Sequence, residues 1–528
     1  MRSSLDLLVR GGVVIDGTGG ARYRADIGVV AGRIREIGVL HGVRAEIEVD
    51  ATDRYVLPGF IDAHVHADGA VWDPAVQLAM LRQGVTTLAL GQDGLSFAPA
   101  TTEALSWVSR YFHAVNGLLG TGPIGTLERT KQPAGRSAIF GVAELLGRYR
   151  GTTALNTVYL VPHGTIRYSV MGGVPGAPDS GQLAAMIRMA EEGLDHGAVG
   201  ISSGLGYLPG KYATSAELAA VCRPAARRGL PYVTHMRSYG DAAGSGVSEA
   251  CAIGRLAGAP IHISHYHGPS PLLIGLIDAA LKTDLDISFD TYPYLRGCSI
   301  LAKVLPDWLA TPDLDRTLDA LGDRNVRKRL AEETEPAVWR QLTLAYVPGD
   351  LFGWAVGMRL CDAALQACLT PADLCAELLI DTALGAGVVF DFTDDESSIS
   401  ELLCHDVHMG GSDGIYLGGR PHPRGYGAFA RLLRRHVRDL GDWTWEQAAV
   451  HLAARPAQRF RLADRGAITR GRMADLTIID PIAVTDHATY AHPRLLATGI
   501  DDVIIAGTPV LASGHLTGRL PGAPLRPC

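Results

Sequence analysis

The sequence predicts an α/β protein: a (β/α)8 TIM barrel joined to a small β-sandwich domain that both chain termini build. Two observations lead to this prediction. The middle of the chain alternates short apolar runs with helical segments, about eight times, as a parallel sheet requires. Both ends of the chain contain short β-branched runs broken by glycine turns instead. We therefore expect residues 1–57 and 465–528 to form the small domain, and residues 58–464 to form the barrel.

The two ends of the chain share one sequence pattern, in which short β-branched runs are separated by glycines. Near the N-terminus the runs are DLLVRGGVVIDGTGG, ADIGVVAGRIREIGVL and AEIEVDATDRYVLPG. Near the C-terminus they are GAITRGRMADLTIIDP and DDVIIAGTPVLASGHL. Alternating β-branched residues with intervening glycines are typical of hairpins, so the two ends are expected to share one β domain.

Strand-like runs in the middle of the chain are apolar on both faces, which suits a sheet covered on both sides. They are GVTTLALG, TVYLVPHG, GAVGISSG, LPYVTHMR, APIHISHYH, LDISFDTYPY and VHMGGSDG. Helical segments separate most of them. Two of these segments begin with the pattern of a capping box, Thr214 with Glu217 and Thr444 with Gln447. Residues 298–345 interrupt the alternation, and we interpret them as an insertion near the active face, able to act as a lid.

Composition restricts the classes of partner. The 528 residues carry a net charge of -7, which argues against nucleic acid or an anionic membrane as partner. No apolar run approaches the ~20 residues that span a bilayer, and the N-terminal stretch lacks the apolar region of a signal peptide. The eight cysteines form no CxxC pair, which indicates reduced thiols. We expect a cytoplasmic protein that acts on a small molecule, and the sequence leaves homo-oligomer formation open.

Side chains able to bind a metal end several of the apolar runs. The carboxyl ends of barrel strands meet at one mouth, so residues far apart in sequence become neighbours there. His64 and His66 are two residues apart, and on a strand they would share one face. Neutral imidazoles and carboxylates suit zinc and related divalent ions. The metal ligands predicted in this way are His64, His66, Asp93, His235, His265 and Asp413.

Two further residues near strand ends are assigned supporting roles. A lone histidine at a strand end is more often structural than a ligand. His163, in VPHGTIR, is therefore expected to hydrogen-bond a metal ligand rather than bind the ion itself. Asp290, in FDTYPY, is expected to be structural and to orient a ligand histidine.

Long motifs carry a resemblance to a known family. They are PGFIDAHVH, GVTTLALGQDGLSFAP, SSGLGYLPG, THMRSYGD, ISHYH, DTYPY, GSDG followed by HPRGYGAF, and RPAQRFRLADRGAITRGRMADLTIIDP. The chain resembles the amidohydrolase superfamily and, within it, the D-aminoacylase (N-acyl-D-amino-acid deacylase) family, nearly from end to end. That family has a TIM barrel with a small β domain made from both chain ends.

The resemblance implies a role for individual residues. His64, His66, His235 and His265 fall on the metal-binding histidines of the family, and Asp413 falls on its catalytic aspartate. The other matches concern the substrate. Tyr207 and Arg424 fall on residues that hold the substrate carboxylate, and Tyr292 falls on a tyrosine near the scissile carbonyl.

Three positions depart from the family. Asp93, in GQDGLS, replaces a metal-binding cysteine; its carboxylate is a harder ligand than a thiolate, which favours a binuclear site, or Mn or Ni. His267 replaces a lysine, and Cys298, with Ser299 beside it, replaces a serine. His267 and Cys298 are expected to line the substrate site, so these replacements put the details of substrate recognition in question.

The implied function is hydrolysis of an N-acyl-D-amino acid with one or two zinc ions as cofactor. A divalent ion lowers the pKa of bound water and polarises the carbonyl for attack by metal-bound hydroxide. Asp413 would act as general base and then as general acid toward the leaving amine, while Tyr292 would stabilise the oxyanion. The preference for D-amino acids follows from the resemblance alone.

Two alternatives remain open. A cyclic amide or imide hydrolase of the hydantoinase or dihydroorotase kind would use the same metal chemistry. Such enzymes often bridge their metals with a carboxylated lysine, and no lysine occupies the strand-end positions. A catalytically inert scaffold that kept the barrel is the other alternative, and the complete set of ligands argues against it.

Overall fold

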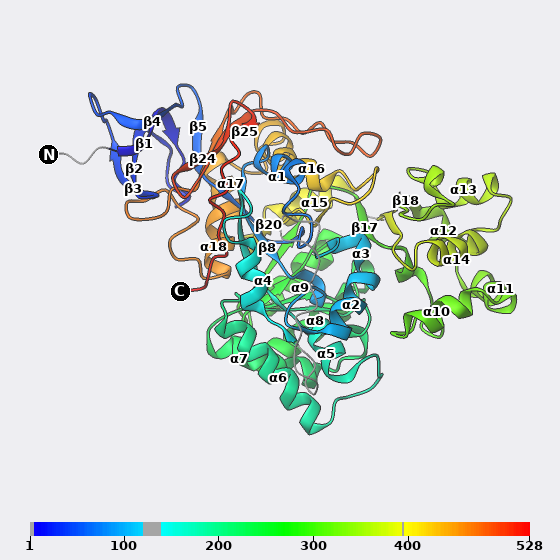
Figure 1. Ribbon diagram of the computed structural model, residues 1–528. Helices are drawn as coiled ribbons and strands as arrows, with labels where there is room; N and C mark the ends of the chain where they lie inside the picture. The colour runs from blue at the N-terminus through cyan, green and yellow to red at the C-terminus, as the bar shows by residue number, and fades with distance from the viewer. Residues whose placement is uncertain (1–4, 120–138, 393–394) are drawn as a thin grey trace.

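Parallel strands run through the centre of the computed structural model, which describes residues 5–119, 139–392 and 395–528 (Figure 1). One parallel sheet has the order β11-β8-β6, and a second has the order β12-β13-β14-β15-β16-β20. The strands are β6 Phe60–Asp62, β8 Val85–Leu90, β11 Asn156–Tyr159, β12 Val161–Pro162, β13 Ile201–Gly204, β14 Tyr232–His235, β15 Ile261–Ile263, β16 Ile287–Thr291 and β20 His408–Gly410.

The edges of the two parallel sheets are connected. Only Leu160 separates β11 from β12, and its backbone N–H donates to the carbonyl of Leu90 in β8. At the other edge, the N–H of Ala63 after β6 donates to the carbonyl of Gly410 in β20, at 3.1 Å. Two short strands, β7 Val65–His66 and β21 Gly414–Ile415, continue this contact as a parallel pair. These hydrogen bonds place the edges of the two parallel sheets next to each other.

Helices follow most of the parallel strands, as the sequence predicts. The helices are α1 Pro74–Leu81, α2 Thr102–Tyr111, α3 His113–Asn116, α4 Val142–Tyr149, α5 His163–Met171, α6 Ser180–Asp195, α7 Ser215–Arg227, α8 Ala243–Ala257, α9 Ser270–Leu281, α15 Glu396–Leu403, α16 Arg424–Arg431, α17 Trp445–Ala449 and α18 Arg455–Arg459.

Two of these helices are predicted to begin with a capping box. The capping box of Thr444 and Gln447 is complete. At Thr214 only half forms, because the Glu217 side chain binds elsewhere.

Both ends of the chain contribute to one nine-stranded sheet. Its order is β25-β24-β23-β22-β5-β1-β2-β3, with β4 paired to β1. The antiparallel pair β5–β22 joins the two ends. A β-sandwich consists of two facing sheets, whereas hydrogen bonds connect these nine strands in one sheet. The β-sandwich therefore stays a prediction. The strands are β1 Leu5–Val14, β2 Tyr23–Val30, β3 Arg33–Gly38, β4 Ala45–Asp50, β5 Tyr55–Pro58, β22 Leu476–Ile479, β23 Ile500–Ile505, β24 Thr508–Ala512 and β25 His515–Leu516.

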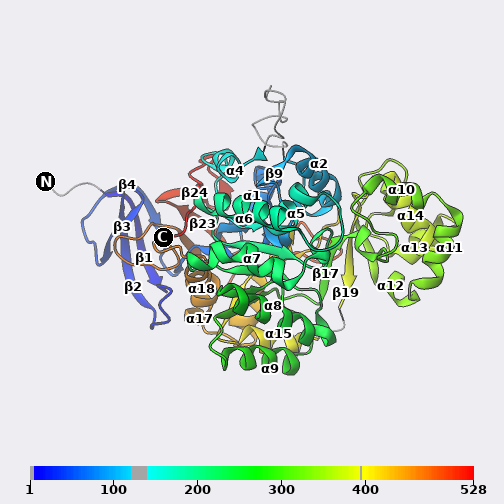
Figure 2. The ribbon, with the colours of Figure 1, turned by 90° about the horizontal axis from the view of Figure 1, so that it is seen from below.

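An excursion leaves the parallel strands between β16 and β20 and lies opposite the terminal sheet (Figure 2). It contains a three-stranded antiparallel sheet in the order β17-β19-β18. It extends beyond the expected range 298–345. The predicted range ends too early because the later helices of the excursion have the same sequence pattern as barrel helices. Its elements are β17 Arg296–Ile300, α10 Leu314–Leu321, α11 Arg324–Glu333, α12 Pro336–Gln341, β18 Leu342–Tyr346, α13 Leu360–Gln366, α14 Pro371–Asp381 and β19 Gly387–Asp391.

Two expectations about composition can be compared with the structure. Within the described ranges, no single helix has the length and apolar character to cross a bilayer, and only the bent pair α13 and α14 meets those criteria jointly. All eight cysteines are free thiols. Three of them, Cys222, Cys251 and Cys375, are buried.

Candidate metal centre

The six predicted metal ligands lie at or just after the carboxyl ends of parallel strands. Asp93 follows β8, His265 follows β15 and Asp413 follows β20, each in a left-handed backbone conformation with φ of 55°, 36° and 48°. Asp and His adopt this region more readily than most residues. Such tight turns end the strand and direct the side chain toward its neighbours. We call His64, His66, Asp93, His235, His265 and Asp413 the metal centre.

The imidazoles of the metal centre converge as two pairs. His64 Nε2 lies 3.4 Å from His66 Nε2. His235 Nδ1 lies 2.8 Å from His265 Nε2. The first pair comes from the segment after β6, and the second comes from β14 and the turn after β15. All four side chains are buried, at 0 to 6% exposure, so their convergence is a property of the interior.

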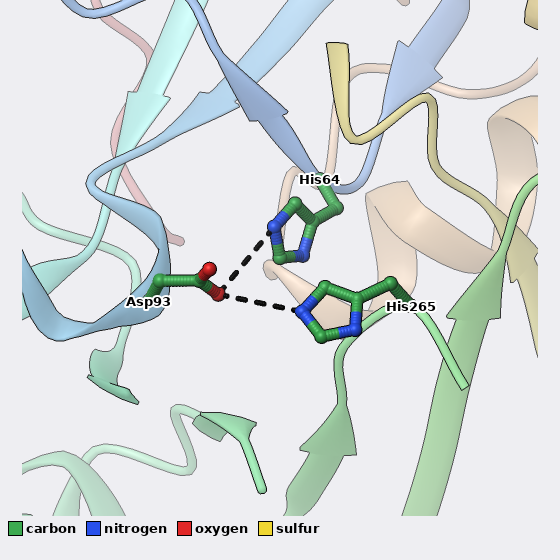
Figure 3. A group of neighbouring side chains, drawn as sticks. All are labelled: His64, Asp93 and His265. Carbon is green, nitrogen blue, oxygen red and sulfur yellow. Dashed lines mark ion pairs between the residues drawn. The ribbon is translucent and has the colours of Figure 1, made fainter. Parts of the chain in front are cut away.

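Asp93 lies between the two histidine pairs. Its Oδ1 is 3.6 Å from His64 Nε2 and 3.7 Å from His265 Nε2. Figure 3 shows the Asp93 carboxylate directed toward both rings. Its Oδ2 is 3.6 Å from His66 Nε2 and 3.4 Å from His235 Nδ1. Each carboxylate oxygen thus faces one nitrogen from each pair, so Asp93 could contribute a metal ligand together with histidines of either pair.

The spacing of these atoms fits metal ligation better than direct hydrogen bonding. Ligands at about 2.1 Å from a tetrahedral zinc ion are about 3.4 Å apart. The contacts of Asp93 with the four histidines, at 3.4 to 3.7 Å, match this separation. Asp93 Oδ1 is buried and has no hydrogen-bond partner in the described part of the chain. Buried carboxylate oxygens are rarely left unpartnered, so a cation fits here.

Electrostatics in the metal centre favour a bound cation. Burial disfavours the charged ring of His66, yet the carboxylates of Asp413 and Asp93 raise its pKa to about 10. Burial also works against the charged form of Asp93, but His235, His265 and His66 hold the pKa of Asp93 well below its usual range. The carboxylates therefore remain ionised and draw positive charge, whether a proton or a metal ion.

Two neighbouring side chains orient the ligand histidines. His66 Nδ1 lies 3.1 Å from Asn116 Oδ1, which leaves Nε2 free to face the metal centre. Asp290 is buried and lies 3.6 Å from His64 Nδ1, while its Oδ1 accepts a 2.9 Å hydrogen bond from the backbone N–H of His265. Its other oxygen contacts His262 Nε2 at 2.9 Å. Asp290 thus fixes the backbone of His265 by a hydrogen bond and lies close to the ring of His64.

Arg424 and Tyr292 continue the site from Asp413. Arg424 Nη1 lies 2.9 Å from Asp413 Oδ2, while Asp413 Oδ1 faces His66 Nε2 at 3.3 Å. Burial would raise the pKa of Asp413, but Arg424 and His66 outweigh it and hold this pKa well below its usual range. The Arg424 guanidinium lies 4.6 Å from the centre of the Tyr292 ring. Arg424 is fully buried, and its Nε has no hydrogen-bond partner in the described residues, so it retains donor capacity.

A cavity of about 150 Å³ adjoins the metal centre, and the predicted substrate residues line it. The Tyr207 hydroxyl is 2.8 Å from Ser299 Oγ. The Cys298 thiol also faces the cavity, and burial raises its pKa to about 11. His267 stacks between Tyr239 and Phe392, with ring centres 4.9 and 4.0 Å away. Burial lowers the pKa of His267 to about 3, so the His267 ring is uncharged at neutral pH.

His163 contacts a different group from the one expected. Its Nε2 lies 2.9 Å from Glu217 Oε1, and Arg167 Nε donates to the same oxygen at 3.0 Å. Within the described residues its hydrogen bond is to Glu217 and not to a metal ligand. We call His163, Arg167 and Glu217 the His163 cluster. The cause is local: His163 begins α5, and this turns its ring toward α7, which carries Glu217.

Several residues of the site carried no readable sequence signal. Asn116 ends the short helix α3, far from any strand end, and nothing in its surroundings indicates a metal-site partner. Lys303 and Phe390 belong to the excursion, whose path back to the cavity the sequence does not reveal. Tyr239 lies in the family-like motif THMRSYGD, so the resemblance is the one signal that points to it.

Comparison with known proteins agrees with the geometry. The profile described as "Amidohydrolase family" matches residues 362–511. The chain is 33% identical to an N-acyl-D-glutamate deacylase of Alcaligenes xylosoxydans xylosoxydans, over 98% of this chain and 97% of that protein. It is also 33% identical to a D-aminoacylase of the same organism, over 98% and 96% of the two chains.

Solved structures show the same relationship. The N-acyl-D-glutamate deacylase of Bordetella bronchiseptica, complexed with zinc and a phosphonate mimic of the tetrahedral intermediate, superposes with a TM-score of 0.81 at 31% identity, over 99% of this chain and 100% of that one. A D-aminoacylase structure described for its binuclear metal centre superposes with a TM-score of 0.79 at 30% identity, with the same coverage. The resemblance inferred from the sequence motifs is confirmed: the chain belongs to the D-aminoacylase family of amidohydrolases.

Proposed function

We propose that the protein hydrolyses the amide bond of an N-acyl-D-amino acid and releases a carboxylate and a free D-amino acid. The observation that carries this proposal is the convergence of four imidazoles and two carboxylates beside a cavity that also contains a buried arginine. Relatives named for this activity align over nearly the whole chain, which supports the same reaction here.

We propose zinc as the cofactor, bound by the metal centre as one or two ions, with Mn or Ni as further candidates. Two groups of side chains have the spacing to hold an ion, His64 with His66 and Asp413, and His64 with Asp93 and His265; His235 lies beside the second group. When bound, a divalent ion polarises the amide carbonyl and lowers the pKa of water. The carboxylate of Asp93 favours hard ions more than a thiolate would.

Proton movement is assigned to Asp413. Its depressed pKa keeps the carboxylate ionised at neutral pH, which is the form able to accept a proton from the attacking water. Once protonated, the same carboxyl is a strong acid and returns the proton readily to the leaving amine. Arg424 holds Asp413 Oδ2, which fixes the orientation of the carboxylate during both steps.

Substrate binding is assigned to the polar groups around the cavity. The planar guanidinium of Arg424 has an unpartnered Nε that suits the α-carboxylate of the substrate. Tyr207 supports the same carboxylate, and Tyr292 would donate its hydroxyl to the developing oxyanion. His267 and Cys298 would line the part of the cavity that receives the variable group of the substrate.

We further propose that the parallel strands close into a (β/α)8 barrel, with residues 1–57 and 465–528 as the small β domain. The hydrogen bond from Ala63 to Gly410 and the pairing of β7 with β21 support closure. A closed barrel explains how ligands from residues 64 to 413 meet at one mouth.

The two alternative functions are less well supported. Solved D-hydantoinases superpose at only 15 to 16% identity, so they speak to the fold alone. Asp93 occupies the central position between the histidine pairs, where a carboxylated lysine would otherwise have to lie. The inert scaffold is disfavoured by the complete ligand set.

A substrate panel tests the proposed function. Protein loaded with Zn, Mn or Ni would be assayed with N-acetyl-D-amino acids, their L enantiomers and cyclic imides. We expect turnover of the D series. Turnover restricted to cyclic imides would favour the hydantoinase-like alternative. Absence of bound metal by elemental analysis, with no activity after metal addition, would favour the scaffold.

A further inference from the structure

We propose that Lys303 binds a second anionic group of the substrate, beyond the α-carboxylate. The preferred substrate would then be an N-acyl-D-amino acid with a further carboxylate, on its side chain or on its acyl group. This inference rests on the proposed function and names the substrate class of the same site.

Lys303 reaches the cavity from the excursion. It lies in the 3-10 turn Leu301–Val304, directly after β17, and lines the cavity together with Cys298 and Ser299. Its Nζ lies 5.0 Å from the centre of the Tyr207 ring, within range of a cation–π interaction. Lys303 is an exposed residue, so a ligand that enters the cavity can reach its ammonium group.

Lys303 lacks the carboxylate partner that comparable cations have. In the described part of the chain, no ion pair or hydrogen bond joins it to an acidic residue. By contrast, Arg424, at the same cavity, is paired with Asp413 at 2.9 Å. Lys211 also lies over a tyrosine ring, that of Tyr212 at 5.7 Å, but its Nζ is 2.7 Å from Asp307 Oδ1. Lys303 therefore resembles Lys211 with its acidic partner removed.

A substrate carboxylate would supply that partner. Arg424 has an ion pair with Asp413, whereas Lys303 has no ion pair within the described residues; the charges of Asp93 and Asp413, which line the same cavity, act on Lys303 from beyond ion-pair distance. Among the other residues that line the cavity, Phe390 and Phe392 are apolar and His267 stacks against Phe392, so these three provide no acidic partner. A charge-assisted hydrogen bond to Lys303 would thus distinguish an anionic group from a neutral group of the same shape.

The test uses pairs of substrates that differ in charge and little in shape. The first pair is N-acetyl-D-glutamate and N-acetyl-D-glutamine, which places the charge on the side chain. The second is N-succinyl-D-methionine and N-succinamoyl-D-methionine, which places it on the acyl group. For each, kcat/KM is measured with the metal-loaded wild type and with Lys303→Met, Lys303→Arg and the matched control Lys211→Met.

We expect the wild type to prefer the charged member of at least one pair by about 10-fold or more. Lys303→Met should abolish that preference and leave kcat/KM for the neutral member within about 3-fold of wild type. Lys303→Arg should retain the preference, and Lys211→Met should leave both members unchanged. The pair that shows the effect identifies which part of the substrate carries the anion.

Three results would overturn the inference. These are equal kcat/KM for both members of both pairs, a preference that persists in Lys303→Met, or an equal loss for charged and neutral members in that variant. If the metal-loaded wild type hydrolyses none of the four compounds nor any N-acetyl-D-amino acid, the proposed function fails, and the inference fails with it.

Discussion

Two buried clusters of histidine and carboxylate lie at ends of the parallel strands, and they behave differently. In the His163 cluster, Glu217 Oε1 is 2.9 Å from His163 and 3.0 Å from Arg167, so its charge is compensated at hydrogen-bond distance. In the metal centre, Asp93 faces its four histidines at 3.4 to 3.7 Å. Direct hydrogen bonds hold the His163 cluster, although Glu217 Oε2 and His163 Nδ1 have no hydrogen-bond partner in the described residues. In the metal centre, His235 Nδ1 and His265 Nε2 are 2.8 Å apart, but the distances from Asp93 to all four histidines match the separation of ligands around an ion. The spacing around the carboxylate therefore distinguishes the two clusters.

Local backbone geometry produces this difference. His163 and Glu217 project from helices α5 and α7, so they meet side by side as neighbouring helical residues do. Asp93, His265 and Asp413 project from left-handed turns directly after strands. These turns direct side chains from three separate strands toward one point.

The largest effect on turnover is expected from Asp413→Asn. The amide keeps a similar shape but cannot accept the proton of water, so turnover should fall by about 10³–10⁴-fold. Most of the metal should remain bound, because the histidine pairs and Asp93 are intact. Steady-state kinetics and elemental analysis of the purified variant check both expectations. Near-normal turnover would remove Asp413 from the proposed mechanism.

Asp93 should determine which metal the protein holds. Asp93→Asn removes the negative charge between the histidine pairs, so metal content should fall and turnover should fall with it. Asp93→Cys keeps an anionic ligand but makes it softer, and it should lower the affinity for Mn relative to Zn by about 10-fold or more. Competition between the two metals, measured by elemental analysis after equilibrium dialysis, checks this. Unchanged metal content and selectivity in both variants would show that Asp93 is not a ligand.

Asp290→Asn tests the support of the ligands rather than the ligands themselves. The amide would weaken the contacts with His64, His262 and the backbone of His265, so metal affinity should fall by about 10- to 100-fold. Excess metal should restore most of the turnover, since the ligands and Asp413 remain. Titration with a chelator, followed by activity at saturating metal, separates this outcome from misfolding. A variant that excess metal does not rescue would contradict a purely orienting role.

The sequence predicts the fold class and the ligands better than their surroundings. Strand runs and polar residues at their ends are local patterns, so all six members of the metal centre could be named and are brought together. The contact between Arg424 and Asp413 depends on how the loop after β20 folds back, and no local pattern records that path. The role expected of His163 was wrong for a related reason: its partner, Glu217, lies 54 residues away on a helix. The pattern at Thr214 had assigned Glu217 to a helix cap instead.

The smallest effect on turnover is expected from Glu217→Gln, which opens the His163 cluster. Removing one member of a buried ion pair costs about 3–5 kcal/mol of stability, because Arg167 loses its compensating charge. Turnover per folded molecule should remain within about 2-fold, since the His163 cluster does not touch the metal centre. Thermal and urea denaturation, together with kinetics at a temperature where both proteins are folded, check this. A loss of turnover as large as that of Asp290→Asn would show that the His163 cluster contributes to the function of the metal centre.

Wild type and Glu217→Gln should also differ in how their stability depends on pH, and the direction of this difference can be predicted. Burial would raise the pKa of Glu217, but His163 and Arg167 outweigh it, and the pKa lies below the ordinary value of 4.5. A carboxyl whose pKa is depressed on folding contributes stability that is fully present above its unfolded pKa and is lost as the pH falls through its folded pKa. The wild type should therefore exceed Glu217→Gln in stability by a constant amount above about pH 5, and the gap should narrow at lower pH. Chelator-treated protein is the right sample, because metal loss from the metal centre then makes no contribution. A gap that widens as the pH falls would mean that Glu217 is protonated in the folded protein, and the His163 cluster would no longer be the charge-compensated counterpart of the metal centre.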